Sequence, residues 1–68
     1  MVEGSEALSE REMEVLHLLN DGLSNRQVAE ELIVTVGTVK THVHNIYGKL
    51  GVKRRTEAIV RARELHLL

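Results

Sequence analysis

The sequence predicts an all-α domain of four helices, and three features of the chain support this prediction. Apolar residues recur at intervals of three and four in four successive segments, the spacing that places them on one face of a helix. A Ser that can cap a helix precedes each of the first two segments, and a Thr precedes the third. Only three to five residues separate one segment from the next, so consecutive helices must pack against each other.

The first two predicted helices begin with the same capping pattern. Ser9 is followed three residues later by Glu12, and Ser24 is followed at the same spacing by Gln27. This pattern is the capping box, in which each side chain accepts a hydrogen bond from the other residue's backbone N–H. The helices that follow these serines are predicted at 10–20 and 25–32.

The third predicted helix, residues 36–50, begins after Thr35 and ends before Gly51. Its outer face is small and polar, and no Asp or Glu occurs between residues 34 and 55. Such a face suits an anionic ligand, although an ordinary solvated face is the alternative. The residues expected in the core are Val39, Val43, Ile46, Tyr47 and Leu50.

A fourth helix is predicted from Thr56 to about Leu65. Val60 falls outside its apolar stripe, where it is either an ordinary exposed aliphatic or half of a dimer contact. The residues expected to point inward are Ala58, Ile59, Ala62 and Leu65, and those expected to point outward with Val60 are Glu57, Arg61 and Glu64.

Composition excludes several classes of function. The chain of 68 residues has no Cys and one aromatic residue, Tyr47, which argues against thiolate metal sites and against stacking platforms for single strands. No apolar run approaches the roughly 20 residues of a membrane span, so a cytoplasmic protein without membrane contact is expected. His42 and His44 lie about 200° apart around a helix and cannot chelate one ion. No catalytic or phosphate-binding motif occurs, so no enzymatic activity, cofactor or small-molecule substrate is expected.

Charge is divided unequally between the two halves of the chain. Residues 1–34 contain eight acidic side chains and two arginines, a net charge of −6, whereas residues 35–68 contain seven basic and two acidic side chains, a net charge of +5. The total of −1 therefore hides a basic half. Because phosphates respond to the local field, such a molecule can dock on nucleic acid in one orientation.

The second and third predicted helices are joined tightly enough to form a helix-turn-helix, and the sequence around them is recognisable. The runs LSEREMEVLHLL, GLSNRQVAEEL and TVKTHVHNIYGKLGVKRRTEAI strongly resemble the LuxR-type helix-turn-helix, the output domain of many bacterial response regulators and quorum-sensing activators. The resemblance covers residues 8–68 without a gap and leaves 1–7 as a tail or linker remnant. It implies a four-helix bundle of the winged-helix-like class that has no wing.

The resemblance also implies a function. A LuxR-type domain is expected to bind double-stranded DNA as the output domain of a transcription regulator, with the third helix in the major groove. The fourth helix is expected to make the contact of a homodimer on DNA, and RNA polymerase is a further expected partner. A regulatory domain normally precedes such a domain, so the chain resembles an isolated output domain or a small stand-alone regulator. The alternatives are a module retained for protein–protein interaction and the promoter-reading domain of a sigma factor.

Individual roles follow from the positions that match the LuxR-type pattern. The implied base-reading residues are Lys40, Thr41, His44 and Asn45. The expected phosphate contacts are Ser24, Asn25, Thr38, Lys49, Lys53, Arg54 and Arg55, and the expected dimer contacts are Glu57, Val60, Arg61 and Glu64.

The chain departs from the LuxR-type pattern at several positions. His44 stands where a long basic residue is frequent, which leaves the base preference open. Ile33 stands in the turn where Gly is frequent, which leaves the backbone angles of the turn open. Gly37 and Gly48 on the outer face either let a duplex approach closely or simply weaken the helix.

Overall fold

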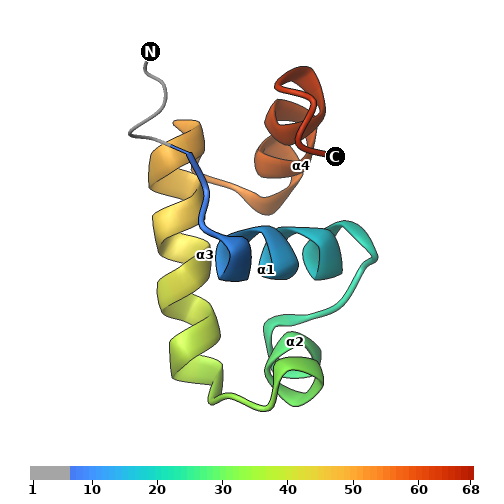
Figure 1. The fold of residues 1–68 in the computed structure, drawn as a ribbon, viewed down its shortest axis with the longest axis vertical. Coiled ribbons are helices and arrows are strands. Elements are labelled where there is room, and N and C mark those ends of the chain that lie inside the picture. Colours follow the sequence, from blue (N-terminus) through green and yellow to red (C-terminus); the bar gives the residue numbers. More distant parts are fainter. Residues whose placement is uncertain (1–6) are drawn as a thin grey trace.

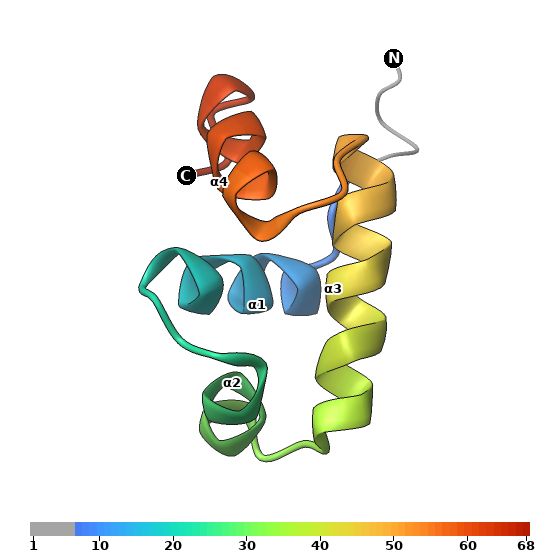
Figure 2. The same cartoon turned by 180° about the vertical axis from the view of Figure 1, so that it is seen from behind.

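The computed structural model of the chain describes residues 7–68, so most of the predicted tail, residues 1–6, lies outside the described residues. Four helices follow one another: α1 (Glu10–Asn20), α2 (Asn25–Leu32), α3 (Val36–Leu50) and α4 (Arg55–Glu64). α3 runs along one side of the molecule, and α1 extends across it between α2 and α4 (Figure 1). The reverse view shows α2 and α4 on opposite sides of α1 (Figure 2). The predicted all-α, four-helix fold is therefore confirmed, and residues 7–68 contain no strand.

One hydrophobic core joins the four helices. α1 and α3 each contact the three other helices, so the apolar stripe of α3 is covered along its whole length. No helix within residues 7–68 is long and apolar enough to cross a membrane. The buried apolar residues are Val15, Leu16, Leu19, Val28, Ala29, Val39, Val43, Ile46, Leu50, Ala58 and Ala62.

Both predicted capping boxes are present. The Ser9 N–H donates to Glu12 Oε1 at 2.9 Å, and the Glu12 N–H donates to Ser9 Oγ at 3.1 Å. Ser24 and Gln27 make the equivalent pair of bonds, at 2.9 and 3.2 Å. Each box satisfies backbone donors that a helix N-terminus leaves without an intrahelical partner. The starts of α1 and α2 are therefore determined by local sequence.

The end of α4 differs from the prediction. Leu65 was expected to point inward, but the expectation is wrong, because the helix ends at Glu64 and Leu65 is 45% exposed. His66 then adopts the left-handed conformation with φ 61°, which reverses the chain. Leu67 and Leu68 pack against the core instead. The helix also begins one residue earlier than predicted, at Arg55.

The turn between α2 and α3 contains a strained residue. Ile33 has φ 57° and ψ 52°, the left-handed region, and its side chain is 90% exposed. A β-branched residue is rare in this region, because its Cβ approaches the following carbonyl oxygen. The chain therefore accepts a backbone strain at this turn that Gly would not experience, and it gains almost no burial of the Ile33 side chain in return.

Replacement of Ile33 by Gly should stabilise the domain. We expect Ile33→Gly to raise the free energy of unfolding by about 1 kcal/mol, less than the full left-handed penalty because Gly also makes the unfolded chain more flexible. Urea denaturation followed by circular dichroism measures this difference. Ile33→Ala is the matched control, since it removes the same exposed surface but keeps a Cβ and should gain less. Equal stability of the Gly variant and the native chain would show that the turn carries no strain.

Candidate nucleic-acid interface

The predicted base-reading residues share the exposed outer face of α3. Lys40, Thr41, His44 and Asn45 are all exposed, whereas the opposite face of the same helix is buried in the core. Because α3 contains no Asp or Glu, its outer face presents one ammonium group and several hydrogen-bonding groups without any carboxylate. The structure therefore places these four residues on one surface that an anionic ligand can approach.

The N-terminus of α3 adds a pair of hydroxyl groups to this surface. Thr35 Oγ1 accepts the Thr38 N–H at 3.1 Å and lies 3.0 Å from Thr38 Oγ1. Whichever hydroxyl donates to the other, one hydroxyl hydrogen remains for an external acceptor. Both threonines are exposed, and the first turn of α3 has no acidic residue. Sequence reasoning assigned Thr35 only as a cap and missed that it forms this donor pair with Thr38.

The N-terminus of α2 offers fewer free groups than the sequence suggested. The Ser24 N–H is occupied by Gln27, and the Ser24 hydroxyl oxygen accepts the Gln27 N–H. The donors left at this end are the N–H groups of Asn25 and Arg26, because the first turn of a helix has no intrahelical acceptor for them. Asn25 therefore presents a backbone donor, whereas the backbone donor of Ser24 is already engaged.

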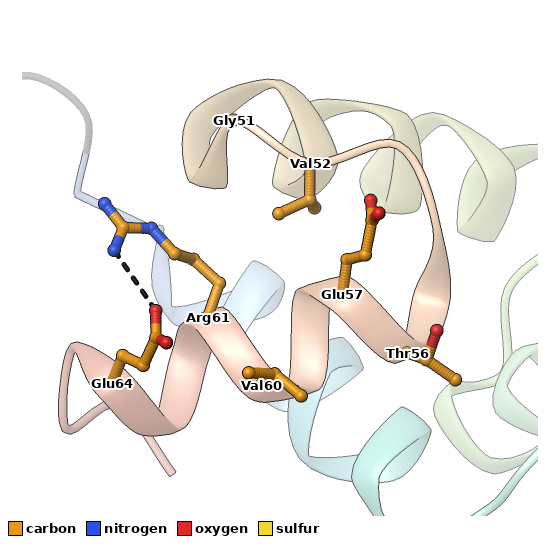
Figure 3. A pocket seen from close by; sticks show the side chains of 7 residues that line it. All are labelled: Gly51, Val52, Thr56, Glu57, Val60, Arg61 and Glu64. Atoms are coloured by element: carbon orange, nitrogen blue, oxygen red, sulfur yellow. Dashed lines mark hydrogen bonds and ion pairs between the residues drawn. The ribbon is translucent and has the colours of Figure 1, made fainter.

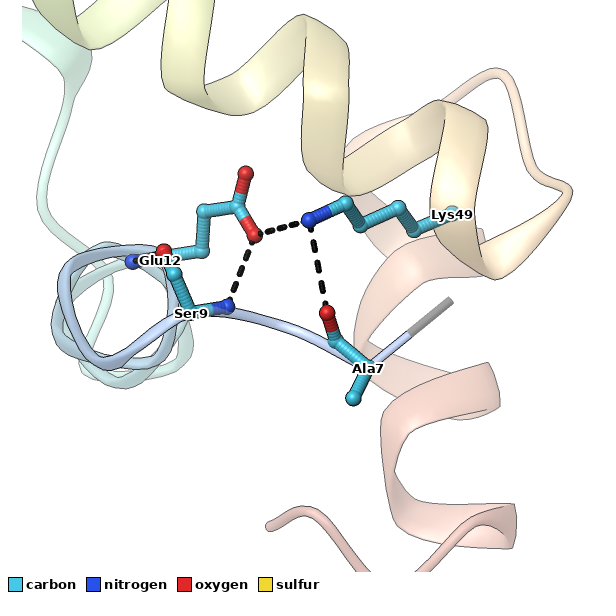
Figure 4. A network of polar contacts seen from close by, with 4 residues as sticks. All are labelled: Ala7, Ser9, Glu12 and Lys49. Carbon is cyan, nitrogen blue, oxygen red and sulfur yellow. Dashed lines mark hydrogen bonds and ion pairs between the residues drawn. The ribbon is translucent and has the colours of Figure 1, made fainter. Parts of the chain in front are cut away.

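Lys49 lies between α3 and the start of α1. Its ammonium donates to Glu12 Oε1 at 2.8 Å and to the Ala7 carbonyl oxygen at 3.3 Å (Figure 4). The side chain of Glu12 is 7% exposed and that of Lys49 is 29% exposed. Lys49 could contact a phosphate only by leaving a nearly buried carboxylate without its cation.

The Glu12 carboxyl is ionised by its partners in spite of its burial. Burial alone raises its pKa, but the hydrogen bonds from Lys49 and from the Ser9 N–H, together with the Lys49 charge, outweigh burial. The net result is a pKa below the ordinary value of 4.5. Because this pKa is lower in the folded than in the unfolded chain, the interaction stabilises the fold above about pH 4.5 and is lost as pH falls through the lowered pKa.

The basic segment between α3 and α4 divides into two parts. Arg55, the first residue of α4, is half-buried, and its Nη2 donates to the Leu19 carbonyl oxygen at the end of α1 at 2.7 Å. Lys53 and Arg54 are exposed. Arg54 is the N-cap of α4 and makes no side-chain capping bond, as the sequence indicated. The exposed positive charge of this segment therefore comes from Lys53 and Arg54.

The outward residues of α4 line an open groove of about 430 Å³. Val60 is 55% exposed at its centre, and Arg61 Nη1 lies 3.4 Å from Glu64 Oε1 (Figure 3). Glu57 also accepts the Lys53 N–H at 3.1 Å and so helps to cap α4. The groove-lining residues are Gly51, Val52, Thr56, Glu57, Val60, Arg61 and Glu64, which include all four predicted dimer residues.

The glycines on the outer face of α3 are not required by packing inside the domain. A Cβ at Gly48 would meet no atom within 4 Å, and one at Gly37 would lie 3.8 Å from Thr35 Oγ1. Within residues 7–68, no group of three His, Asp or Glu side chains is placed to hold a metal ion. The exposed surface of α3 is thus the main concentration of groups available to a ligand.

Comparison with known proteins identifies the family. Residues 6–62 match the family described as bacterial regulatory proteins, luxR family. The chain belongs to this family. The predicted resemblance is confirmed, and the chain is a LuxR-type helix-turn-helix DNA-binding domain of the kind found in transcription regulators, without an enzymatic role.

Relatives within the LuxR family are similar over most of this chain. Transcriptional regulatory protein LiaR of Bacillus subtilis (strain 168) is 48% identical over 63 residues, which cover 93% of this chain and 30% of LiaR. LnrK from the same organism is 55% identical over 53 residues, which cover 78% of this chain and 24% of LnrK.

Solved LuxR-family structures have the same fold. The crystal structure of response regulator ChrA, of a heme-sensing two-component system, superimposes with a TM-score of 0.89 at 55% identity, covering 91% of this chain and 31% of ChrA. The transcription factor GerE superimposes with a TM-score of 0.84 at 34% identity, covering 90% of this chain and 91% of GerE. The chain thus spans less than a third of LiaR, LnrK and ChrA but most of GerE.

The ion pair between α1 and α3 should determine the stability of the domain in acid. We expect Glu12→Gln to lower the free energy of unfolding at pH 7 by about 1–3 kcal/mol, because the Lys49 ammonium loses its charged partner. Stability of this variant should also fall less steeply than that of the native chain as pH drops below 4.5. Denaturation curves at a series of pH values measure both effects.

Glu14→Gln is the matched control for Glu12→Gln. The Glu14 side chain is 57% exposed and pairs with Arg11 on the surface of α1, so its replacement should change stability by less than about 0.5 kcal/mol. Parallel acid profiles for Glu12→Gln and the native chain would contradict the role given to the Glu12 carboxylate.

Proposed function

We propose that this LuxR-type domain binds double-stranded DNA in a site-selective manner, with α3 in the major groove. The observation that carries the proposal is the exposed, carboxylate-free outer face of α3, which is wide enough in residue types to bond to base edges. Lys40 can donate to guanine O6 and N7, and His44 and Asn45 can each hydrogen-bond to bases. Gly37 and Gly48 leave both ends of this face free of side chains, so a duplex can come close.

The proposed phosphate contacts lie at the two ends of α3. Asn25 and Thr38 lie near its N-terminal end, and Lys53 and Arg54 follow its C-terminal end (Figure 1). A helix in the major groove has a phosphate backbone on either side, so donors at both ends fit this arrangement. Lys49, Arg55 and the Ser24 backbone are weaker candidates, because each would first have to give up a bond within the domain.

The groove on α4 supports a homodimer on DNA. It combines an exposed aliphatic residue, Val60, with side chains of both charges, as a surface that pairs with its own copy requires. The surface is small, so the dimer is expected to form on DNA, where two half-sites about one helical turn apart hold the copies together.

The cellular role follows from the relatives. LiaR and LnrK are transcriptional regulatory proteins, and ChrA is a response regulator of a two-component system. We therefore assign this domain the output function of a bacterial transcription regulator in the cytoplasm, with RNA polymerase as a further partner. A protein-interaction module without DNA binding is the alternative, and the absence of acidic residues from α3 disfavours it.

Selection of binding sites from a random duplex pool tests the proposal. Enrichment of a repeated half-site, followed by a salt titration on the selected and scrambled duplexes, would support a site-selective regulator. Salt-sensitive binding without enrichment would replace it with a non-specific DNA binder. Absence of binding at low salt would favour the protein-interaction alternative.

Lys40→Ala should reduce selectivity at one base pair. We expect a loss of about 1–3 kcal/mol on the selected site and little change on scrambled DNA, because the contact is to a base edge. Lys53→Ala is the comparison, since loss of a phosphate contact should weaken both duplexes equally and reduce the salt slope by about 0.9. Fluorescence anisotropy at several salt concentrations measures both. Equal losses on the two duplexes for Lys40→Ala would contradict its assignment as a base reader.

Val60→Glu should prevent assembly of two copies on DNA. The added carboxylate would lie opposite its own copy in a self-paired groove, and burial of an unpaired charge is unfavourable. We expect normal affinity for a duplex with one half-site but loss of cooperative binding to two half-sites, measured by sedimentation and by mobility shift. Unchanged cooperativity would remove α4 as the dimer contact.

A further inference from the structure

The side chain of Thr41 is committed to a bond within α3. Its hydroxyl oxygen, Oγ1, donates to the Gly37 carbonyl oxygen, one turn earlier in the helix, at 3.1 Å. Thr41 is also exposed on the outer face of α3, next to Lys40 and one turn from His44 and Asn45. The hydroxyl hydrogen is therefore used inside the helix, and Thr41 has no second hydrogen to donate to a ligand.

This bond fixes which part of Thr41 faces outward. The substituents of Cβ are staggered, so when Oγ1 is drawn toward the helix backbone the methyl group takes a different position around Cβ. A helical side chain leans over the preceding turn, and the residue there, Gly37, has no side chain to cover the methyl group. A Cβ at Gly37 would have room within the domain, so the uncovered space is not a requirement of internal packing.

We infer that Thr41 recognises a thymine by contact between its methyl group and the thymine 5-methyl group. The inference rests on the proposed insertion of α3 into the major groove. Guanine O6 and N7 and thymine O4 are acceptors there, and a side chain needs a free donor to bind them. Thr41 has spent its donor on Gly37, whereas the thymine 5-methyl group requires only an apolar contact. Thr41 is thus a specificity-determining residue that reads shape and apolarity rather than hydrogen bonds.

The competing use of Thr41 is as an acceptor. Its oxygen retains a lone pair that could accept from the amino group of adenine or cytosine. The bond to Gly37 disfavours this use, because it holds the oxygen toward the helix backbone while the methyl group remains at the periphery. The two uses predict opposite effects when the methyl group and the hydroxyl group are removed separately.

Replacement of each thymine by deoxyuridine in the selected duplex tests the inference, since it removes the 5-methyl group alone. We expect deoxyuridine at one position to weaken binding of the native chain about fourfold, the value of one buried methyl group. Thr41→Val keeps the methyl group and removes the hydroxyl, so it should retain affinity and the same deoxyuridine effect. Thr41→Ser keeps the hydroxyl and removes the methyl group, so it should lose about fourfold on the thymine duplex and show no deoxyuridine effect there.

Other outcomes would overturn the inference in distinguishable ways. A deoxyuridine effect that persists in Thr41→Ser assigns the thymine to another residue. Weak binding by Thr41→Val together with normal binding by Thr41→Ser assigns base recognition to the hydroxyl group. Selective binding that no deoxyuridine weakens removes thymine recognition but leaves the proposed function intact. Absence of any selected site overturns the proposed function itself, and the thymine contact with it. Thermal unfolding of each variant confirms that an altered affinity does not result from an unfolded domain.

Discussion

Burial of the inner face of α3 is the constraint on which the rest of this domain depends. Val39 and Ile46 are completely buried on that face, and burial of each such side chain contributes about 1.5–3 kcal/mol. Three other helices are needed to cover the face, and in so small a chain they leave little apolar surface for a second core. The same packing leaves the outer face of α3 uncovered, so the stable fold and the exposed interface have a common cause.

Most of the fold could be predicted from local sequence, because its helices begin and end with local signals. The Ser9 and Ser24 boxes, the Thr35 cap and the left-handed Gly51 all involve residues within one helical turn of each other. Leu65 could not be placed in the same way. Its orientation depends on the left-handed His66, and nothing in a helical periodicity predicts a reversal at a histidine.

The candidate interface was only partly predictable for a related reason. Helical periodicity places Lys40 and His44 on the outer face of α3, and both are exposed there. Lys49 and Arg55 are engaged by Glu12 and Leu19, which lie 37 and 36 residues away in the sequence. A basic residue looks equally available in the sequence whether or not a distant group occupies it, so only the folded arrangement distinguishes the two kinds.

The strain at Ile33 has a consequence for how this domain can change over generations. New binding preferences arise through substitutions on the outer face of a recognition helix, and many such substitutions cost some stability. A residue that costs stability and contributes little burial is a reserve, because a single later replacement can restore what several altered contacts have lost. The turn lies next to the helix that would have to diversify. Lineages that acquire Gly or Asn at Ile33 would therefore be able to explore more DNA sequences before the domain fails to fold.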